Sequence, residues 1–462
     1  MRILDPGVLQ LEFIRHPPLT CICTLLSIPR NPPLIPQFTM FNKSALLLAV
    51  TLALSVAASP SPAPAEAVAR NIPLPKRSSL TRPDGVFDKD KAIAANIATI
   101  NKHRQNLINL QKNKGVGAFN PGAEIKELAS LPKDVEARML RRAEKRQIEK
   151  LTDEDSDEEW AGTISIGTPR AEILDRLRHR LLRSLGPLLF MHQLHLLFQV
   201  QIQGFLVLDV VQEDGHILDP VRRRVNVTVA GVTATKQAFS PVTTLSSSFA
   251  DDPVDGILGL AFPAISNLNA NPFFVTANAA GKVNANQFGF YLASSGSTLD
   301  LGGTDTSKYS GDIEFIPVDS SGGFWQATGG KAKVGSSSVV TGIETIIDSG
   351  TTLAYGPPAD IKKIFAKVPG STLFDSTNGF YSYPCDSPPE ISFNWGGQDW
   401  TISADNLNLG TTESGSSDCV ASLAAQDLGL GTNVFLLGDA FMKNAYTVFD
   451  FDQEAVGFAG LS

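Results

Sequence analysis

Histidine and cysteine are scarce in this sequence, which limits the chemistry it can carry. The 462 residues include only six His and four Cys, and no His follows His216. Neither His-Glu-x-x-His nor Gly-x-Ser-x-Gly occurs, so the signatures of zinc metalloproteases and of many serine hydrolases are missing. We therefore expect no metal and no cofactor, and chemistry that does not use a histidine base.

Arginine is absent after Arg224, and the charge divides sharply along the chain. Residues 225–462 hold 9 Lys, no Arg and 23 Asp/Glu, whereas residues 66–150 hold 18 Lys/Arg and 10 Asp/Glu. An acidic body repels nucleic acid, so no nucleic-acid partner is expected. The basic segment is expected to bind this body at neutral pH and to loosen as carboxylates become protonated.

Long apolar runs are also scarce. The stretch MFNKSALLLAVTLALSVAASPSPA begins at Met40 with a Lys, an apolar run from Ala45 to Ala57, and small residues. This pattern predicts a secretory signal at 40–59 and is too short for a membrane span; a buried helix is the alternative. We expect residues 1–39 to be a mistranslated leader and the protein to be secreted or vacuolar, with no membrane partner.

The two cysteines that remain after removal of the leader are Cys385 and Cys419. In a secreted chain, two such cysteines are expected to form a disulfide. A metal site is the alternative, but no His follows His216 to complete one.

Residues 60–150 have a charged, helical pattern. The stretch FDKDKAIAANIATINKHRQNLINLQKN places apolar residues on one helical face, namely Ile93, Ile97, Ile100, Leu107 and Leu110. The segment ends near the dibasic pair Lys145-Arg146, a candidate processing site. We interpret it as a helical propeptide that binds its own body, with a solvated linker as the alternative.

From residue 151 onward, short strand-like runs alternate with Gly and Thr turns, which predicts an all-β body. Two passages resemble each other: DGILGLAF at Asp255–Phe262 and FLLGDAF at Phe435–Phe441. A repeat separated by about half the body suggests two related lobes, which we place at 151–290 and 291–462.

The sharpest motif is ETIIDSGTTLAYGPP, Glu344 to Pro358. Its apolar residues predict a buried strand that ends at Asp348, followed by a turn of Ser349, Gly350, Thr351 and Thr352. Hydroxyl and backbone N–H groups in such a turn can hold the carboxylate ionised and oriented. An ordinary structural Asp-Ser-Gly turn is the alternative.

The segment Asp348 to Thr352, the later FLLGD at Phe435–Asp439 and the C-terminal YTVFDFDQEAVGFA resemble the second lobe of pepsin-like aspartic endopeptidases of the secreted fungal type. The resemblance covers 225–462 and EEWAGTISIGTP before residue 170. It implies a bilobed all-β fold, a zymogen, a monomer, and hydrolysis of protein or peptide substrates at acid pH. It also implies a water held between two aspartates that share a proton, with Asp348 as the second-lobe member and Thr351 as the residue that orients it.

The first-lobe partner of Asp348 is missing. The resemblance implies an Asp-Thr-Gly soon after Thr168-Pro169 and a flap tyrosine, but the chain has no Asp-Thr-Gly and no Tyr before Tyr291. Both losses fall within 170–224, which has thirteen Leu, four His and no Thr, Asn, Lys or Tyr. This composition is foreign to the surrounding body.

A shifted reading frame explains this stretch. With one choice of codons, Arg170 to Pro187 read one base later gives AQKFLIDFDTGSSDLWV, and the codon of the missing aspartate straddles Arg178 and His179. The alternative is a genuine helical insertion, with MHQLHLLFQVQIQGFLVLDVV as a buried amphipathic helix. The chain as printed is expected to be inactive and to fold poorly, and a pseudoprotease that binds peptides or proteins is the alternative function.

Overall fold

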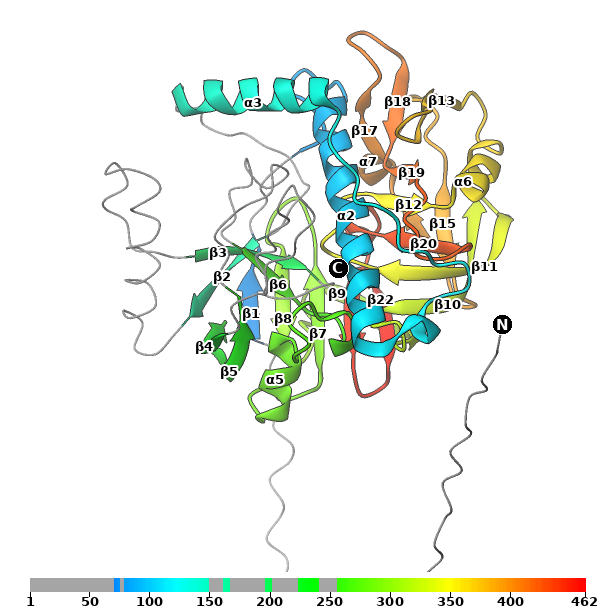
Figure 1. Cartoon of the computed structure of the whole chain (residues 1–462). Coiled ribbons are helices and arrows are strands. Elements are labelled where there is room, and N and C mark those ends of the chain that lie inside the picture. Colours follow the sequence, from blue (N-terminus) through cyan, green and yellow to red (C-terminus); the bar gives the residue numbers. More distant parts are fainter. Residues whose placement is uncertain (1–69, 75–78, 149–160, 167–195, 202–222, 241–255) are drawn as a thin grey trace, which may run out of the picture. The chain divides into compact units, whose positions relative to one another are not determined.

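The computed structural model describes residues 70–74, 79–148, 161–166, 196–201, 223–240 and 256–462 (Figure 1). All of them belong to one compact unit, Pro64–Ser462. The expected leader and signal peptide lie outside the described residues, as does most of 170–224. In the described ranges, no helix has the length and apolar character needed to cross a bilayer.

The described body is mostly β, as expected, and its strands form three sheets. Among the described residues, one sheet has the order β5 (Val232–Phe239), β4 (Arg223–Val229), β2 (Ala161–Ile166), β3 (Leu196–Gln201) and β6 (Gly256–Gly259). A second has the order β13 (Thr372–Asp375), β14 (Phe380–Pro384), β18 (Asp418–Ala421) and β17 (Asn408–Thr411).

The largest sheet carries most of the acidic body. It runs through β1 (Arg70–Pro73), β8 (Thr298–Leu301), β7 (Gln287–Tyr291), β21 (Tyr446–Asp450), β22 (Ala455–Leu461), β9 (Tyr309–Asp319), β10 (Gln326–Val334), β11 (Ser337–Ile347), β20 (Val434–Leu437), β12 (Ala354–Gly356) and β19 (Leu423–Ala425). Strand β15 (Ile391–Asn394) pairs with β10 and with β16 (Trp400–Ile402). Strand β1, from the basic segment, thus forms one end of a sheet built mainly from residues after 286.

In the part of the chain that the structure describes, the long helices lie before residue 150. Two long ones lie there, α2 (Lys89–Lys114) and α3 (Lys133–Ile148), followed in the body by α5 (Phe273–Ala279), α6 (Pro358–Phe365), α7 (Ala404–Leu407) and α8 (Asp439–Met442). Single 3-10 turns occur at η1 (Val116–Ala118) and η3 (Pro263–Ile265). The helical pattern predicted for 60–150 therefore corresponds to α2 and α3.

Local sequence sets both ends of α2. The Asp88 side chain caps the first turn by accepting a hydrogen bond from Lys91 N, and Gly115 ends the helix with φ 86°, a conformation that favours glycine. Four of the five predicted apolar positions are buried, but Ile97 is only half-buried. Polar residues share the buried face instead, namely Asn96, Thr99, His103, Asn106 and Asn109.

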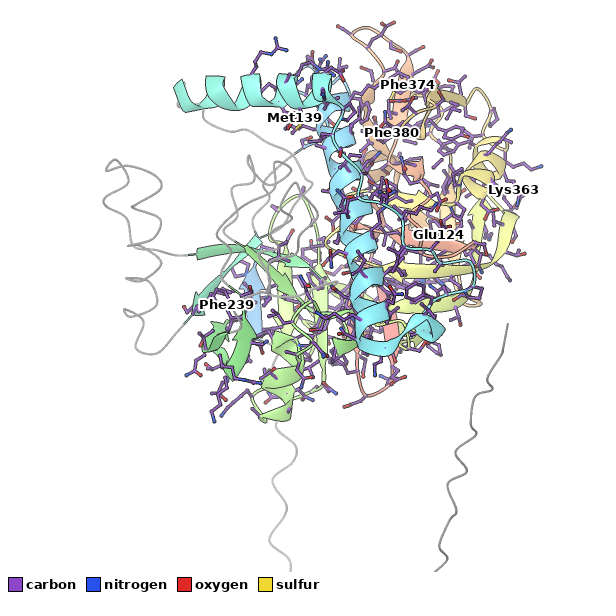
Figure 2. The ribbon with its side chains drawn as sticks, viewed as in Figure 1. Glu124, Met139, Phe239, Lys363, Phe374 and Phe380 are labelled. Carbon is purple, nitrogen blue, oxygen red and sulfur yellow. A yellow bond between two sulfur atoms is a disulfide. The ribbon has the colours of Figure 1, made fainter. Side chains whose placement is uncertain are left out.

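The apolar face of α2 shares a core with the body. Ile100 and Leu107 lie in one cluster of buried residues with Ile346 and Leu353. Just before the helix, the ring of Phe87 packs edge-on against Phe380, with centroids 5.1 Å apart; Figure 2 labels this body residue. A solvated linker would not be buried in this way, so α2 does not fit that alternative.

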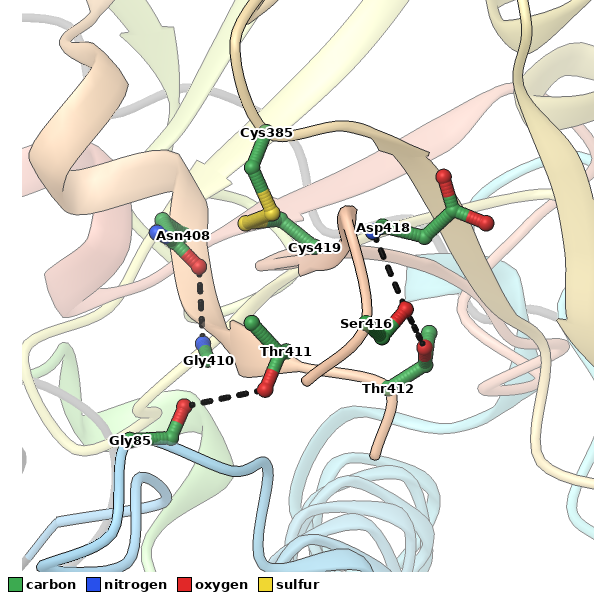
Figure 3. The surroundings of a disulfide bond; sticks show 9 residues. All are labelled: Gly85, Cys385, Asn408, Gly410, Thr411, Thr412, Ser416, Asp418 and Cys419. Atoms are coloured by element: carbon green, nitrogen blue, oxygen red, sulfur yellow. Dashed lines mark hydrogen bonds between the residues drawn. A yellow bond between two sulfur atoms is a disulfide. The ribbon is translucent and has the colours of Figure 1, made fainter. Parts of the chain in front are cut away.

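The disulfide lies beside a second contact of the basic segment. Cys385 and Cys419 are joined, and Cys419 of β18 pairs in register with Thr411 of β17 (Figure 3). Thr411 N donates to Gly85 O at 3.0 Å, and its hydroxyl also donates to Gly85 O. The bond therefore ties down the strand pair on which the chain docks just before α2.

The doubtful stretch 170–224 is described only at 196–201 and 223–224. Residues 196–201 form β3, between β2 and β6, and β4 starts at Arg223 without a break before Val225. The alternative of a continuous amphipathic helix through this region is therefore wrong over 196–201. Extended backbone there gains ladder hydrogen bonds on both sides, which a helix at that position would forfeit.

Asp300 of β8 is a buried acid that links three strands. Tyr446 OH of β21 donates to its Oδ2 at 2.6 Å, and Asn71 Nδ2 of β1 donates to its Oδ1 at 2.9 Å. Burial raises the pKa of Asp300 to about 6, although both hydrogen bonds oppose the rise. The folded chain therefore holds a proton at Asp300 that the unfolded chain releases at lower pH.

A raised carboxyl pKa stabilises the fold in acid. The contribution is complete below the unfolded pKa of about 3.9 and is lost as pH rises through about 6, amounting to up to about 3 kcal/mol. The measurement is Tm as a function of pH for wild type and for Asp300→Asn. We expect the Tm of wild type to fall more between pH 4 and pH 7 than the Tm of Asp300→Asn. Equal pH dependence in the two proteins would contradict this role.

Candidate active site

The Asp348 carboxylate is delivered to the site by a buried strand. Ile346 and Ile347 of β11 are fully buried, and β11 pairs in parallel with β20. The backbone continues this pairing, because Asp348 N donates to Leu437 O at 3.0 Å. Asp348 is itself 0% exposed, so its charge requires partners within the protein.

The turn after Asp348 supplies such partners. Gly350 N donates to Asp348 Oδ1 at 3.0 Å, and Thr351 Oγ1 donates to Oδ2 at 2.6 Å. Ser349 and Thr351 are buried, and Thr352 O accepts a hydrogen bond from Ala440 N, which fixes the turn against α8. The predicted residues thus lie together, and the donors are those that the motif suggested.

The strongest partner of Asp348 comes from the basic segment. Lys102 Nζ of α2 lies 2.6 Å from Asp348 Oδ2 and also donates to Gly350 O at 2.6 Å and to Thr351 Oγ1 at 2.9 Å. The Lys102 side chain is only 15% exposed, so this ion pair is largely shielded from water. One ammonium group therefore occupies the carboxylate and the turn that holds it.

The electrostatics of Asp348 follow from these contacts. Burial alone would raise the pKa of this carboxyl, but the Lys102 ammonium beside it holds that pKa far below its usual range. Asp348 is therefore ionised in mild acid while α2 is docked. With the Lys102 ammonium bound to Oδ2, Asp348 is not available as a base.

His103 lies on the same side of α2 as Lys102, at the same carboxylate. Its side chain is 0% exposed, and its Nε2 is 3.5 Å from Asp348 Oδ2. Neither ring nitrogen has a hydrogen-bond partner among the described residues. The ring of Phe324, from the loop between β9 and β10, lies 6.1 Å from the imidazole, centroid to centroid.

A further contact joins α2 to the strand that follows the Asp348 turn. Tyr355 OH of β12 donates to Asn96 Oδ1 at 2.6 Å, and Asn96 Nδ2 donates to Asn378 O at 3.4 Å. Two turns of helix separate Asn96 from His103, so α2 lies along the body for at least that length.

Each of the two repeated passages pairs in parallel with another strand. Comparing these two strand pairs identifies the residue that corresponds to Asp348 in the other copy. Ile347 pairs with Leu437, which precedes Gly438, and Asp348 follows Ile347. In the other copy, Val200 pairs with Leu258, which precedes Gly259, and Gln201 follows Val200. By register, Gln201 therefore holds the position that corresponds to Asp348, and the chain as printed has no carboxylate at that position.

Sequence reasoning found the Asp348 turn but missed Lys102, His103 and Asn96. One signal was present, because His103 lies three residues after Ile100 and four before Leu107, on the predicted apolar stripe. A polar residue at such a position has a buried partner or a function. Arg178 and His179, where the shifted frame places the first aspartate, lie outside the described residues.

The described ranges contain no cluster of His, Cys, Asp or Glu arranged to hold a metal ion. The polar groups around Asp348 are instead a lysine, a threonine hydroxyl, the backbone N–H of Gly350 and the His103 ring. The arrangement can hold one carboxylate ionised in a buried position.

Comparison with known proteins gives a consistent result. A family model described as "Eukaryotic aspartyl protease" matches residues 221–461. The chain is 37% identical over 239 residues to "Aspartic protease" of Phaffia rhodozyma, covering 51% of this chain and 58% of that protein. It is 39% identical over 240 residues to "Penicillopepsin-3" of Penicillium janthinellum, covering 50% and 59%.

A third relative is "Secreted aspartyl protease 1" of Malassezia globosa, 31% identical over 213 residues, covering 45% of this chain and 51% of that protein. The chain thus matches little more than half the length of these relatives. The matched family region includes Asp348 and its turn but begins after most of the doubtful stretch.

Replacing Thr351 with Val removes one donor to Asp348 and one acceptor for Lys102. Since hydrogen bonds to charged groups contribute about 1.5–3 kcal/mol, we expect Thr351→Val to lower the free energy of unfolding in urea by about that amount at neutral pH. Thr351→Ser keeps the hydroxyl and is the matched control, expected near wild type. Equal losses in both variants would show that the methyl group, and not the hydroxyl, stabilises the site.

Proposed function

The chain belongs to the eukaryotic aspartyl protease family, and on that premise we propose that it is the zymogen of a secreted endopeptidase that cleaves proteins at acid pH. Asp348 is one of two catalytic aspartates in the bilobed fold of the family. The observation that carries the proposal is the buried Asp348 carboxylate, fixed by its own turn and covered by Lys102 of a preceding basic helix. A site built this way holds a reactive carboxylate in a latent state.

In the active enzyme, Asp348 and a first-lobe aspartate hold one water and share one proton. The ionised carboxylate takes a proton from the water as it attacks the peptide carbonyl, and the protonated one donates to the carbonyl oxygen. Gly350 N and Thr351 Oγ1 keep Asp348 oriented for this step, because they bond to different oxygens of the same carboxylate. The reaction needs neither a metal nor a covalent intermediate.

Latency follows from the Lys102 contact. The ammonium lies within 2.6 Å of Asp348 Oδ2, where the water and substrate would have to approach. It also keeps the pKa of Asp348 far below its usual range, so the pair of aspartates cannot share a proton while Lys102 is bound. Departure of α2 removes the positive charge and frees the carboxylate.

The segment 60–150 is then the propeptide. Its shared core with Ile346 and Leu353, the Gly85 contact with Thr411, and the charge contrast with the acidic body all support a bound segment. The dibasic Lys145-Arg146 lies in the last turn of α3 and is a candidate site for its removal. The signal-like run at 40–59 and the secreted relative from Malassezia globosa support secretion.

The missing first aspartate has two explanations, which give two candidate functions. In the first, residues 170–224 are a shifted reading of the segment that carries Asp-Thr-Gly, and the parent protein is an active protease. In the second, the printed chain is a pseudoprotease that binds peptides or proteins without cleaving them. For the printed sequence, the absence of Asp-Thr-Gly and the position of Gln201 favour the pseudoprotease. For the parent protein, the intact Asp348 turn favours the active protease.

The transcript and its product test this proposal together. We expect the transcript between the codons for Thr168 and Val225 to encode Asp-Thr-Gly in a continuous frame. We expect the protein made from that transcript to cleave acid-denatured casein after acidification. Mass spectrometry of the casein fragments measures this cleavage. Asp348→Asn in that protein should reduce the rate by about 10³-fold or more, since it removes a group that transfers protons.

The chain as printed is the matched control, and it should cleave no faster than the Asp348→Asn protein. If the transcript confirms Arg178-His179-Arg180 and the printed chain is inactive, the enzyme function is wrong for this chain, and a pseudoprotease or a non-functional product takes its place. If the printed chain cleaves casein and Asp348→Asn abolishes this, the requirement for a first-lobe aspartate is wrong.

A further inference from the structure

The ion pair that closes the site does not itself respond to mild acid. With Lys102 bound, the pKa of Asp348 lies far below its usual range, so the carboxylate keeps its charge in the pH range where the enzyme would act. Acid must therefore act on another group if it is to free Asp348.

The outer ion pairs between the propeptide and the body also persist in mild acid. Lys89 pairs with Asp375 at 2.9 Å, and Lys126 pairs with Asp427. Burial raises the pKa of Asp375, but Lys89 and the Asn378 hydrogen bonds hold it below its usual value, and the Lys126 hydrogen bond lowers the pKa of Asp427. Both carboxylates therefore stay ionised until strongly acid pH.

Asp300 gains a proton near pH 6 beside strand β1, but its effect has the opposite sign. Because burial raises its pKa, protonation stabilises the folded arrangement rather than loosening it. It cannot release the propeptide in acid. It does provide a control, since it titrates at a propeptide contact in the same pH range.

Among the described residues of this interface, His103 is the remaining group with a suitable ordinary pKa, about 6.5. Its imidazole is fully buried, and both nitrogens lack hydrogen-bond partners in the described part of the chain. A neutral ring can be buried there against Phe324, whereas a charged ring would lose its hydration. The carboxylate nearest to it, Asp348, is 3.5 Å from Nε2 and already accepts from Lys102. The site is therefore built for the neutral form.

We propose that His103 is the acid trigger of the zymogen: the buried imidazole takes up a proton, and the resulting charge drives α2 away from Asp348. The inference rests on the proposed function, because it assumes that α2 belongs to a propeptide. It adds a specific residue that converts external pH into release of the site.

The charged groups that face the ring come from two elements. Lys102, on α2 itself, repels a second positive charge, and Asp348, at the end of β11, attracts it. Asp348 Oδ2 already accepts hydrogen bonds from Lys102 Nζ and Thr351 Oγ1, and its 3.5 Å distance from His103 Nε2 is long for a third. Phe324, from the loop between β9 and β10, brings no charge.

The pKa of His103 differs between docked and released α2. Burial lowers the pKa of His103, Asp348 raises it in part, Lys102 lowers it again, and the net value is below the ordinary one. Released α2 exposes the ring to water, so the released state binds the proton more tightly. Docking is therefore strongest above about pH 6.5 and weakens as pH falls toward the lowered pKa.

The test follows release of α2 directly and does not use catalysis. The full-length chain is placed at a series of pH values and then given a short hydrogen–deuterium pulse at one fixed pH, and mass spectrometry reports the protection of Lys89–Lys114. Wild type should lose this protection below about pH 6.5. His103→Phe and His103→Gln remove the titration and should release α2 at least about one pH unit lower.

Two variants of His103 are compared because a single substitution could change the docking of α2 through packing alone. Phe and Gln differ in size and polarity, so a shift shared by both reports the lost titration. Asp300→Asn is the matched control and should release α2 at the wild-type pH. If both His103 variants are protected at neutral pH and release at the wild-type midpoint, the trigger proposal is wrong although the zymogen proposal stands. If wild-type α2 is unprotected at neutral pH, the proposed zymogen itself is contradicted, and the trigger with it.

Discussion

The ion pair between Lys102 Nζ and Asp348 Oδ2 is the interaction on which the described structure depends. A fully buried carboxylate must have a charged or hydrogen-bonded partner, and here the partner comes from a helix 246 residues away in sequence. The surrounding packing positions both groups for this contact. Strands β11 and β20 bring Asp348 to the end of a buried sheet, and the apolar face of α2 holds the ammonium in register with it.

The two most informative titratable groups respond to acid with opposite signs. Asp300, in the body, favours the folded arrangement as pH falls, because burial raises its pKa to about 6. His103, in the docked helix, disfavours its own position as pH falls, because burial lowers its pKa. One chain can thus stabilise its body and loosen the docking of α2 over the same pH range. This combination suits the zymogen that we propose.

Local patterns predicted much of this structure. The apolar run before Asp348 and the Ser349 to Thr352 turn identified the end of β11, and the apolar spacing identified α2, since both patterns depend on neighbouring residues. Lys102 was not predicted as the partner of Asp348, because their contact depends on how distant elements pack. That Gln201 holds the position corresponding to Asp348 is seen only from the strand register, which a single sequence does not reveal. The doubtful stretch itself offered no family pattern from which to predict a strand.

The most direct measurement is a double-mutant cycle between Lys102 and Asp348. Lys102→Met, Asp348→Asn and the double variant of the full-length chain would be compared with wild type by hydrogen-exchange protection of α2 at neutral pH. Each single variant leaves an unpaired buried group and should cost about 3 kcal/mol of protection. The double variant should lose less than the sum, with a coupling of about 2 kcal/mol or more. Additive losses would show that the two charges do not interact and that α2 is held over the site by packing alone.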